Sequence, residues 1–300
     1  MHLILGYPED TCCAALVERL TADGLAARLI ASPFAPPARL TLRIEPDGAT
    51  TTALALGDGP AEAIESVFVR GRGGLDPAGW EPGDYAYMQA ESQAALLAWL
   101  DALECPVVNR LDAELWYRAR TTLLHWLGQL RDSGLRIPET IVSDSVEALA
   151  AFRGRLESGA VPGAVFKALT REGEWLVGPG EWSGVRALQA HGPVCLAEPH
   201  GPVMLLCVVG EGIVWGGEPS AEQRALEQRL VGFARAAGLA FVEIALAGVR
   251  AGPAVVHVDP QPRLENFAPE VRRRIVDALA ELLTGRRAEA SMAMPMEALP

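Results

Sequence analysis

Lysine is almost absent from this 300-residue chain, because Lys167 is the only one and every other residue among the 26 Lys+Arg is arginine. Lysine carries a compact point charge on a flexible stem, which suits a contact with a phosphate or a purine edge in a narrow cleft. Residues 163–173 predict a strand that carries Lys167 into a glycine-containing turn. The alternative is that the single lysine is an accident of an arginine-rich composition and has no special role.

Metal-binding and disulfide-forming cysteine patterns are also missing. The chain has five cysteines, an odd number, and none is spaced as Cys-x-x-Cys. Neither a disulfide framework nor a zinc site is therefore indicated. Cys195 and Cys207 lie in apolar, strand-like runs and are expected to be small buried residues. We expect a reducing, cytoplasmic environment.

Long apolar runs and an excess of positive charge are absent as well. No run is long enough to span a bilayer, and the N-terminus lacks the basic and apolar regions of a signal peptide. The formal charge of −12 argues against a nucleic-acid or acidic-membrane binder, because phosphate contacts need clustered cations.

Conventional catalytic motifs are missing too. The sequence holds no Gly-x-Ser-x-Gly, His-Glu-x-x-His or Walker A pattern, and its five histidines show no ligand spacing. Trp175, Trp182 and Trp215 are expected to pack inside the fold, with a tryptophan-lined substrate cleft as the alternative.

The segments that are present predict an α/β protein with α+β lobes. Hydrophobic residues make up 50% and charged residues 21%, which is typical of a globular chain with room for two or three small domains. A strand, a helix and a strand open the sequence, and alternating segments around Pro46-Asp47-Gly48 predict a hairpin. Longer helices are expected at 85–103, 113–133, 222–237 and 269–283.

Several short segments then follow one another in a particular order. They are Pro106-Val-Val-Asn109, a long helix, Gly134-Leu-Arg-Ile-Pro-Glu-Thr140, the Lys167 strand, Cys195-Leu-Ala-Glu198, Val208-Val-Gly210 and Val258-Asp-Pro-Gln-Pro-Arg263. Together they resemble the ATP-grasp superfamily, nearest to the branch of ribosomal-peptide maturases and ribosomal-protein glutamate ligases.

This resemblance implies a fold and an activity. It implies a pre-ATP-grasp domain at 1–109, a small lobe at 110–192, a C-terminal lobe at 193–287 and a flexible tail at 288–300. Two such lobes hold ATP and Mg²⁺ between them. The implied activity is an ATP-dependent carboxylate–amine (or –hydroxyl) ligase that acts on a peptide or amino acid through an acyl phosphate.

The resemblance also assigns nucleotide-binding and catalytic residues. Lys167 falls on the strand lysine that contacts the nucleotide, and Glu198 follows the hinge at the adenine or ribose. A solvent-facing strand end is the alternative for Glu198. Leu123 stands where the family has a helix lysine, and Arg120, about one turn away, could reach the phosphates instead. Arg263 would orient the acceptor or the acyl phosphate.

The implied magnesium site departs from the family pattern. Ala245 and His257 replace two oxygen ligands, and Leu205 replaces an arginine that faces the phosphates. Asp259 can still bind Mg²⁺. Glu243, two residues from Ala245 and so on the same face of a strand, can substitute for the lost aspartate. The two carboxylates could equally be polar remnants.

Three functional hypotheses stay open. The first is a working ligase, and the second is a non-catalytic relative (a pseudoenzyme) that binds nucleotide, peptide or a partner protein. The third is an unrelated α/β ligand-binding protein, which predicts Lys167 on an outer face. No nucleic-acid or membrane partner is expected, and a homodimer stays open.

Overall fold

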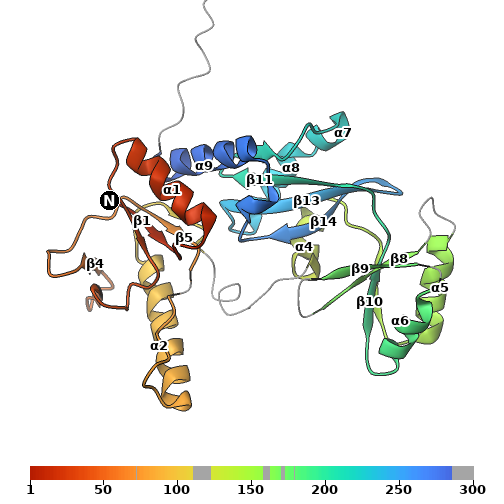
Figure 1. Ribbon diagram of the computed structural model, residues 1–300, viewed down its shortest axis with the longest axis horizontal. Helices are drawn as coiled ribbons and strands as arrows, with labels where there is room; N and C mark the ends of the chain where they lie inside the picture. Colours follow the sequence, from red (N-terminus) through yellow and green to blue (C-terminus); the bar gives the residue numbers. More distant parts are fainter. Residues whose placement is uncertain (72, 111–122, 158–162, 170–172, 179, 286–300) are drawn as a thin grey trace, which may run out of the picture. The chain divides into compact units, whose positions relative to one another are not determined.

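The computed structural model describes residues 1–285 except 72, 111–122, 158–162, 170–172 and 179 (Figure 1). The chain divides into two compact units. The first combines Met1–Asp112 with Arg263–Pro300, and the second is Ala113–Pro262. The α/β fold class predicted from the sequence is confirmed, whereas the predicted domain boundaries stay a prediction.

A four-stranded parallel sheet forms the centre of the first unit. Its order is β2 (Ala27–Ile30), β1 (His2–Leu5), β5 (Ser66–Val69) and β6 (Val107–Val108). Every residue of β1 and β5 is buried, as expected for central strands of a parallel sheet that is covered on both faces.

Helices complete the first unit. α1 (Thr11–Ala22) packs against α9 (Pro269–Thr284), and α9 also contacts β5 and β6. The Asp10 carboxylate caps α1 by accepting hydrogen bonds from the backbone N–H groups of Cys12 and Cys13, which satisfies two donors at the helix end. α2 (Pro82–Asp101) buries Leu96 and Trp99. η2 (Leu264–Asn266) precedes α9.

The predicted hairpin is confirmed. β3 (Ala38–Ile44) pairs antiparallel with β4 (Thr50–Leu56), and Gly48 lies in the turn between them with a φ of 87°. That left-handed backbone conformation favours glycine, which is why the Pro-Asp-Gly sequence predicts the turn.

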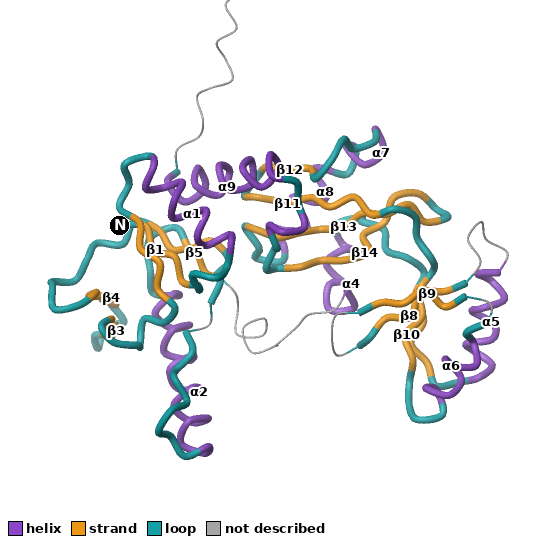
Figure 2. Tube along the Cα trace, viewed as in Figure 1, coloured by secondary structure: helices purple, strands orange, loops and turns teal. Residues whose placement is uncertain are grey.

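The second unit begins with an antiparallel sheet in the order β7 (Thr140–Ser143), β10 (Val194–Ala197), β8 (Ala164–Lys167) and β9 (Glu174–Val177). Helices α5 (Val146–Glu157) and α6 (Trp182–Gln189) lie beside it, as Figure 2 shows. Phe152, Trp182 and Leu196 belong to the hydrophobic core between sheet and helices.

A second antiparallel sheet completes this unit in the order β12 (Gly212–Trp215), β11 (Val203–Val209), β13 (Phe241–Val249) and β14 (Gly252–Asp259). α8 (Glu227–Ala236) contacts β11 and β12, and α4 (Leu127–Asp132) contacts α8. Trp126 of η1 (Leu123–Trp126) meets Phe233 of α8 edge-on, with 5.9 Å between ring centroids.

Three predictions about local structure need correction or restriction. The helix expected at 222–237 is two helices, α7 (Ala221–Arg224) and α8, and a capping box at Ser220 starts the first. Of the helix expected at 113–133, the part up to 122 lies outside the described residues. Trp182 and Trp215 are buried, but Trp175 is 50% exposed, because β9 is an edge strand with a neighbour on one side only.

None of the helices that the structure describes is long and apolar enough to cross a bilayer.

Candidate functional site

A cavity of about 330 Å³ lies within the second unit and is lined by residues of both of its sheets and of η1. We call it the cleft. The residues that line it are Leu123, Leu124, Thr140, Lys167, Ala168, Leu169, Gly173, Glu174, Cys195, Val203, Leu205, Ala245, Val256 and His257. Most of these side chains are apolar, so the cleft offers an apolar slot with a few polar groups, as small-molecule sites commonly do.

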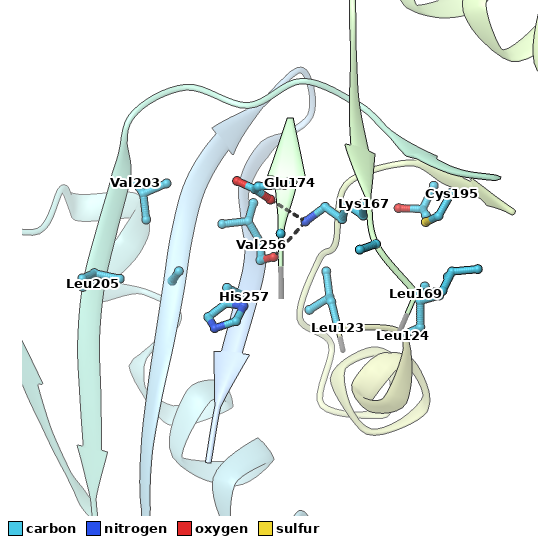
Figure 3. A pocket seen from close by; sticks show the side chains of 14 residues that line it. Leu123, Leu124, Lys167, Leu169, Glu174, Cys195, Val203, Leu205, Val256 and His257 are labelled. Carbon is cyan, nitrogen blue, oxygen red and sulfur yellow. Dashed lines mark hydrogen bonds and ion pairs between the residues drawn. The ribbon is translucent and has the colours of Figure 1, made fainter. Parts of the chain in front are cut away.

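Lys167 is the cation of this cleft. It is the last residue of β8, and its side chain is only 15% exposed. Its ammonium donates to the carbonyl oxygen of Val256 at 3.1 Å and lies 3.2 Å from Oε2 of Glu174, as Figure 3 shows. Lys167 therefore does not lie on an outer face, and the prediction of an unrelated ligand-binding protein is wrong on this point.

The Val256 carbonyl is available to Lys167 because β14 carries a β-bulge. Ala245 pairs with His257 and Leu246 pairs with Val255, so Val256 is the additional residue on its strand. A bulged residue is left out of the regular ladder. The bulge also explains why the consecutive residues Val256 and His257 both line the cleft, although strict strand alternation would separate them.

Glu174 was missed by the sequence analysis, although a signal was present. It is the register partner of Lys167 on β9. The sequence predicts a turn near Arg171 and Gly173 between two strands, and residues 167 and 174 lie at equal distances from the middle of that connection. Directly opposite residues of an antiparallel pair lie side by side on one face.

His200 lies on the other side of the Glu174 carboxylate. Its Nε2 is 3.4 Å from Oε1 of Glu174, and its Nδ1 is 3.0 Å from the carbonyl oxygen of Gly201. A carbonyl only accepts hydrogen bonds, so Nδ1 carries a proton. The neutral ring would then turn a lone pair toward the carboxylate. Protonation removes that repulsion, and Glu174 raises the pKa of His200 against the opposing effect of burial.

The pKa of Glu174 shifts in the opposite direction. The neighbouring His200 contributes most to lowering it, Lys167 adds to this, and partial burial opposes both, which brings the pKa to about 2. Glu174 is therefore a carboxylate at all physiological pH values. The cleft holds a fixed negative charge beside its cation.

This charge cluster predicts a pH dependence of stability. A carboxyl group with a lowered pKa stabilises the fold above its ordinary value of 4.5 and loses that contribution as the pH falls toward 2. A histidine with a raised pKa stabilises the fold below 6.5 and loses that contribution as the pH rises. The unfolding free energies of the wild type and Glu174→Gln should therefore differ most between pH 4.5 and 6.5.

The difference should be about 1 kcal/mol or less, because Glu174 is half exposed and solvent screens the pair. Urea unfolding of both proteins from pH 2.5 to 8 measures it. A difference that does not shrink below pH 4.5 contradicts the assignment.

Glu243 and Asp259 are brought together as expected for a shared site. They are register partners on β13 and β14, and both are buried, with 3% and 9% exposure. Since side chains alternate along strands, they lie on the same face as Ala245, which lines the cleft. Asp259 Oδ1 also accepts a hydrogen bond from the backbone N–H of Gln261 at 2.8 Å. Within the described residues, no group of three or more His, Cys, Asp and Glu forms a ready metal site.

Glu198 is buried, with 8% exposure, so the solvent-facing alternative is wrong. Its Oε1 accepts from the backbone N–H of Arg250 at 3.0 Å, and its Oε2 lies 3.4 Å from the backbone nitrogen of Glu139. The carboxylate thus connects the start of β7 with the turn between β13 and β14. Its role at an adenine or ribose stays a prediction.

The remaining predicted residues are Arg120, Arg263 and the four residues that the resemblance gives as replacements. Arg120 is outside the described residues. Arg263 belongs to the first unit, as the N-cap of η2. Leu123, Leu205, Ala245 and His257, which the resemblance predicts to replace family residues, all line the cleft. The roles of Arg120 and Arg263 stay predictions.

No protein-family model and no curated protein matches this sequence. Solved structures do match. The macrocyclase MdnC from Microcystis aeruginosa MRC, bound with the precursor peptide MdnA, is 18% identical and has a TM-score of 0.71, over 96% of this chain and 100% of that one. The ATP-grasp ligase PsnB, complexed with a phosphomimetic variant of a minimal precursor, Mg and ADP, is 19% identical and has a TM-score of 0.71. The match covers 95% of this chain and 97% of that one.

A third similar structure is that of a RimK domain protein. The RimK domain ATP-grasp protein from Sphaerobacter thermophilus DSM 20745 is 21% identical, with a TM-score of 0.54, over 94% of this chain and 98% of that one. These similarities extend along nearly the whole chain. The chain therefore has the ATP-grasp fold and resembles the macrocyclases and ligases of precursor peptides within that superfamily.

Proposed function

We propose that this protein is an ATP-dependent carboxylate–amine (or –hydroxyl) ligase that acts on a peptide or amino acid. One observation carries the proposal. A single cleft combines Lys167 and an apolar wall, and the sheet face of Ala245 continues to the adjacent carboxylates of Glu243 and Asp259. The similar structures were solved with a precursor peptide, or with a precursor, Mg and ADP, which supports nucleotide and peptide partners.

The cleft has the chemistry that an adenine nucleotide requires. Leucine, valine and alanine side chains form an apolar slot for a planar base, and the Lys167 ammonium can bind a phosphate. Lys167 would hold the nucleotide, while Glu198 and Arg120 are the further candidates for nucleotide contacts.

The pair of Glu243 and Asp259 fits a magnesium ion. Mg²⁺ in nucleotide sites is often held by one or two carboxylates together with substrate phosphates. Bound there, it would neutralise phosphate charge during transfer. His257 prefers softer metals and suits Mg²⁺ poorly, so it adds nothing to this set. Arg263 is the candidate for orienting the acceptor or the acyl phosphate.

A non-catalytic relative is the second candidate function, and a specific observation favours it. Leu123, Leu205 and Ala245, which the resemblance aligns with two cations and a metal ligand of the family, line the cleft, and Lys167 is already paired with Glu174. Such a protein would use the same cleft to bind a nucleotide, a peptide or a partner protein without turnover.

Magnesium-dependent release of ADP tests the ligase proposal. The full chain, MgATP and a panel of carboxylate-containing peptides and amino acids should yield ADP together with a product that is heavier than the peptide by the acceptor minus one water. The matched control omits magnesium. Binding of MgATP without ADP release supports the second candidate, and no binding at millimolar MgATP overturns the ligase.

The cytoplasm is the compartment we propose. None of the five cysteines, all within the described part of the chain, forms a disulfide bond. Proteins of reducing compartments keep their thiols reduced, so the cysteines suit a cytoplasmic protein.

A further inference from the structure

Lys167, the cation of the cleft, already has partners within the protein. The Lys167 ammonium already lies 3.2 Å from the Glu174 carboxylate and 3.1 Å from the Val256 carbonyl oxygen, as the dashed lines in Figure 3 show. Glu174 itself lines the cleft. A ligand phosphate that approaches Lys167 must therefore lie beside a carboxylate of the same sign.

Glu174 is also held in this position. Oε2 faces Lys167 and Oε1 faces His200, so both carboxylate oxygens have a neighbour. His200 is in turn fixed by the contact of its Nδ1 with the Gly201 carbonyl, and its side chain is 10% exposed. An acidic side chain anchored from two sides cannot turn away from the cleft without losing both contacts.

The anchoring has a consequence for ligands of different charge. A neutral nucleoside would bind through the apolar wall and would not meet the Glu174 charge. Each added phosphate would gain attraction to Lys167 but would meet repulsion from Glu174. Solvent screens both effects in part, because the Glu174 side chain is 48% exposed.

We propose that Glu174 is a specificity-determining residue that competes with ligand phosphates for Lys167 and so lowers the preference of the cleft for phosphorylated nucleosides. This inference rests on the proposed adenine-nucleotide site. Replacing the carboxylate by the isosteric amide of glutamine removes the competing charge and keeps the shape. Lys167 then becomes available to a phosphate.

Calorimetric titration without magnesium tests the inference, because it leaves the proposed metal site out of the measurement. Adenosine, AMP and ADP are titrated into the full-length wild type and into Glu174→Gln. Adenosine should bind both proteins equally. ADP should bind Glu174→Gln about threefold to tenfold more tightly than the wild type, with AMP between the two.

Glu139→Gln is the matched control. Glu139 also pairs with cationic side chains, Arg155 at 2.9 Å and Arg250 at 3.5 Å, and it belongs to the same unit without lining the cleft. Its substitution removes the same charge from the same unit. It should leave the ratio of ADP to adenosine affinity unchanged. If Glu139→Gln gains as much ADP affinity as Glu174→Gln, the effect comes from the net charge of the unit, and the inference is overturned.

The single lysine gives a second readout. Selective ¹⁵N-lysine labelling yields one side-chain signal, and ADP should shift that signal more in Glu174→Gln than in the wild type. If Glu174→Gln does not fold, Glu174→Asp, which keeps the charge but shortens the side chain by one methylene, should still give a smaller gain in ADP affinity.

The outcomes separate this inference from the proposed function. Wild-type binding of adenosine and ADP with no gain in Glu174→Gln overturns the role of Glu174 and leaves the nucleotide site standing. ADP binding by Glu174→Gln alone supports the inference, and titration of the wild type with MgATP then decides whether the ligase proposal stands. Binding of neither ligand to either protein overturns the inference, and the MgATP titration then decides the ligase proposal separately.

Discussion

Lys167→Met should lower the affinity for ADP by about 10- to 100-fold, because a hydrogen bond to a charged group contributes about 1.5–3 kcal/mol. Methionine keeps the length of the side chain and its packing against the cleft but removes the charge. It also leaves the Glu174 carboxylate, 3.2 Å from the lysine nitrogen in the wild type, without that cation. Calorimetric titration of ADP measures the change.

The chain has no second lysine to serve as a control, so an exposed arginine takes that place. Arg131 on α4 is 80% exposed and pairs with Asp132 at 3.1 Å. Arg131→Met removes one cation from the same unit and should leave ADP affinity unchanged. Equal affinities of Lys167→Met and the wild type would show that the lysine does not hold the nucleotide.

Lys167→Met also separates the two proposed functions. A ligase needs the nucleotide in the cleft but binds its peptide through other residues as well. Loss of ADP binding with unchanged binding of a peptide or partner therefore favours the ligase. Loss of both at once would place the partner in the cleft itself and favour the non-catalytic relative.

Replacing both carboxylates of the proposed metal site, as Glu243→Gln with Asp259→Asn, should abolish the effect of magnesium on ATP binding and lower ADP release by about 100-fold or more. The reason is that a bound Mg²⁺ contributes several kcal/mol to stabilising charge during phosphoryl transfer. The two residues are direct register partners, so the double variant removes both charges from one place. ATP titrations with and without magnesium, together with single-turnover assays of ADP release, measure the effect.

Glu227→Gln is the control for this pair. Glu227 is a carboxylate of the same unit that accepts a hydrogen bond from Trp215 Nε1 at 2.9 Å and does not line the cleft. Its substitution should preserve the magnesium dependence. A double variant that keeps the full effect of magnesium would show that Glu243 and Asp259 are polar remnants.

The fold was predictable wherever neighbours in the sequence decide the structure. The strand, helix and strand that open the chain and the hairpin with its turn at Gly48 follow from local residue patterns. Trp175 shows the limit of such patterns. Its hydrophobicity predicts burial, but the position of β9 at the edge of its sheet leaves half of the side chain exposed.

The site was predictable only in part. The resemblance to ATP-grasp proteins predicted that Lys167 lies in a cleft and that Asp259 belongs to one site with Glu243, and alternation along a strand added only that Glu243 shares the face of Ala245. The burial of Glu198 was harder to predict. Its partners, Glu139 and Arg250, lie 59 and 52 positions away, and nothing near Glu198 in the sequence indicates them. Its burial as a polar group follows from those distant partners.

The sequence by itself predicted a resemblance to ATP-grasp proteins, one lysine in a cleft and the replacement of several phosphate and metal ligands. Those features are residue identities in a fixed order. Only the tertiary structure decided what the lysine contacts. The pairing with Glu174, the bulge that offers the Val256 carbonyl and the His200 contact bring together residues up to 89 positions apart. Sheet register and long-range packing, which no local pattern encodes, set those distances.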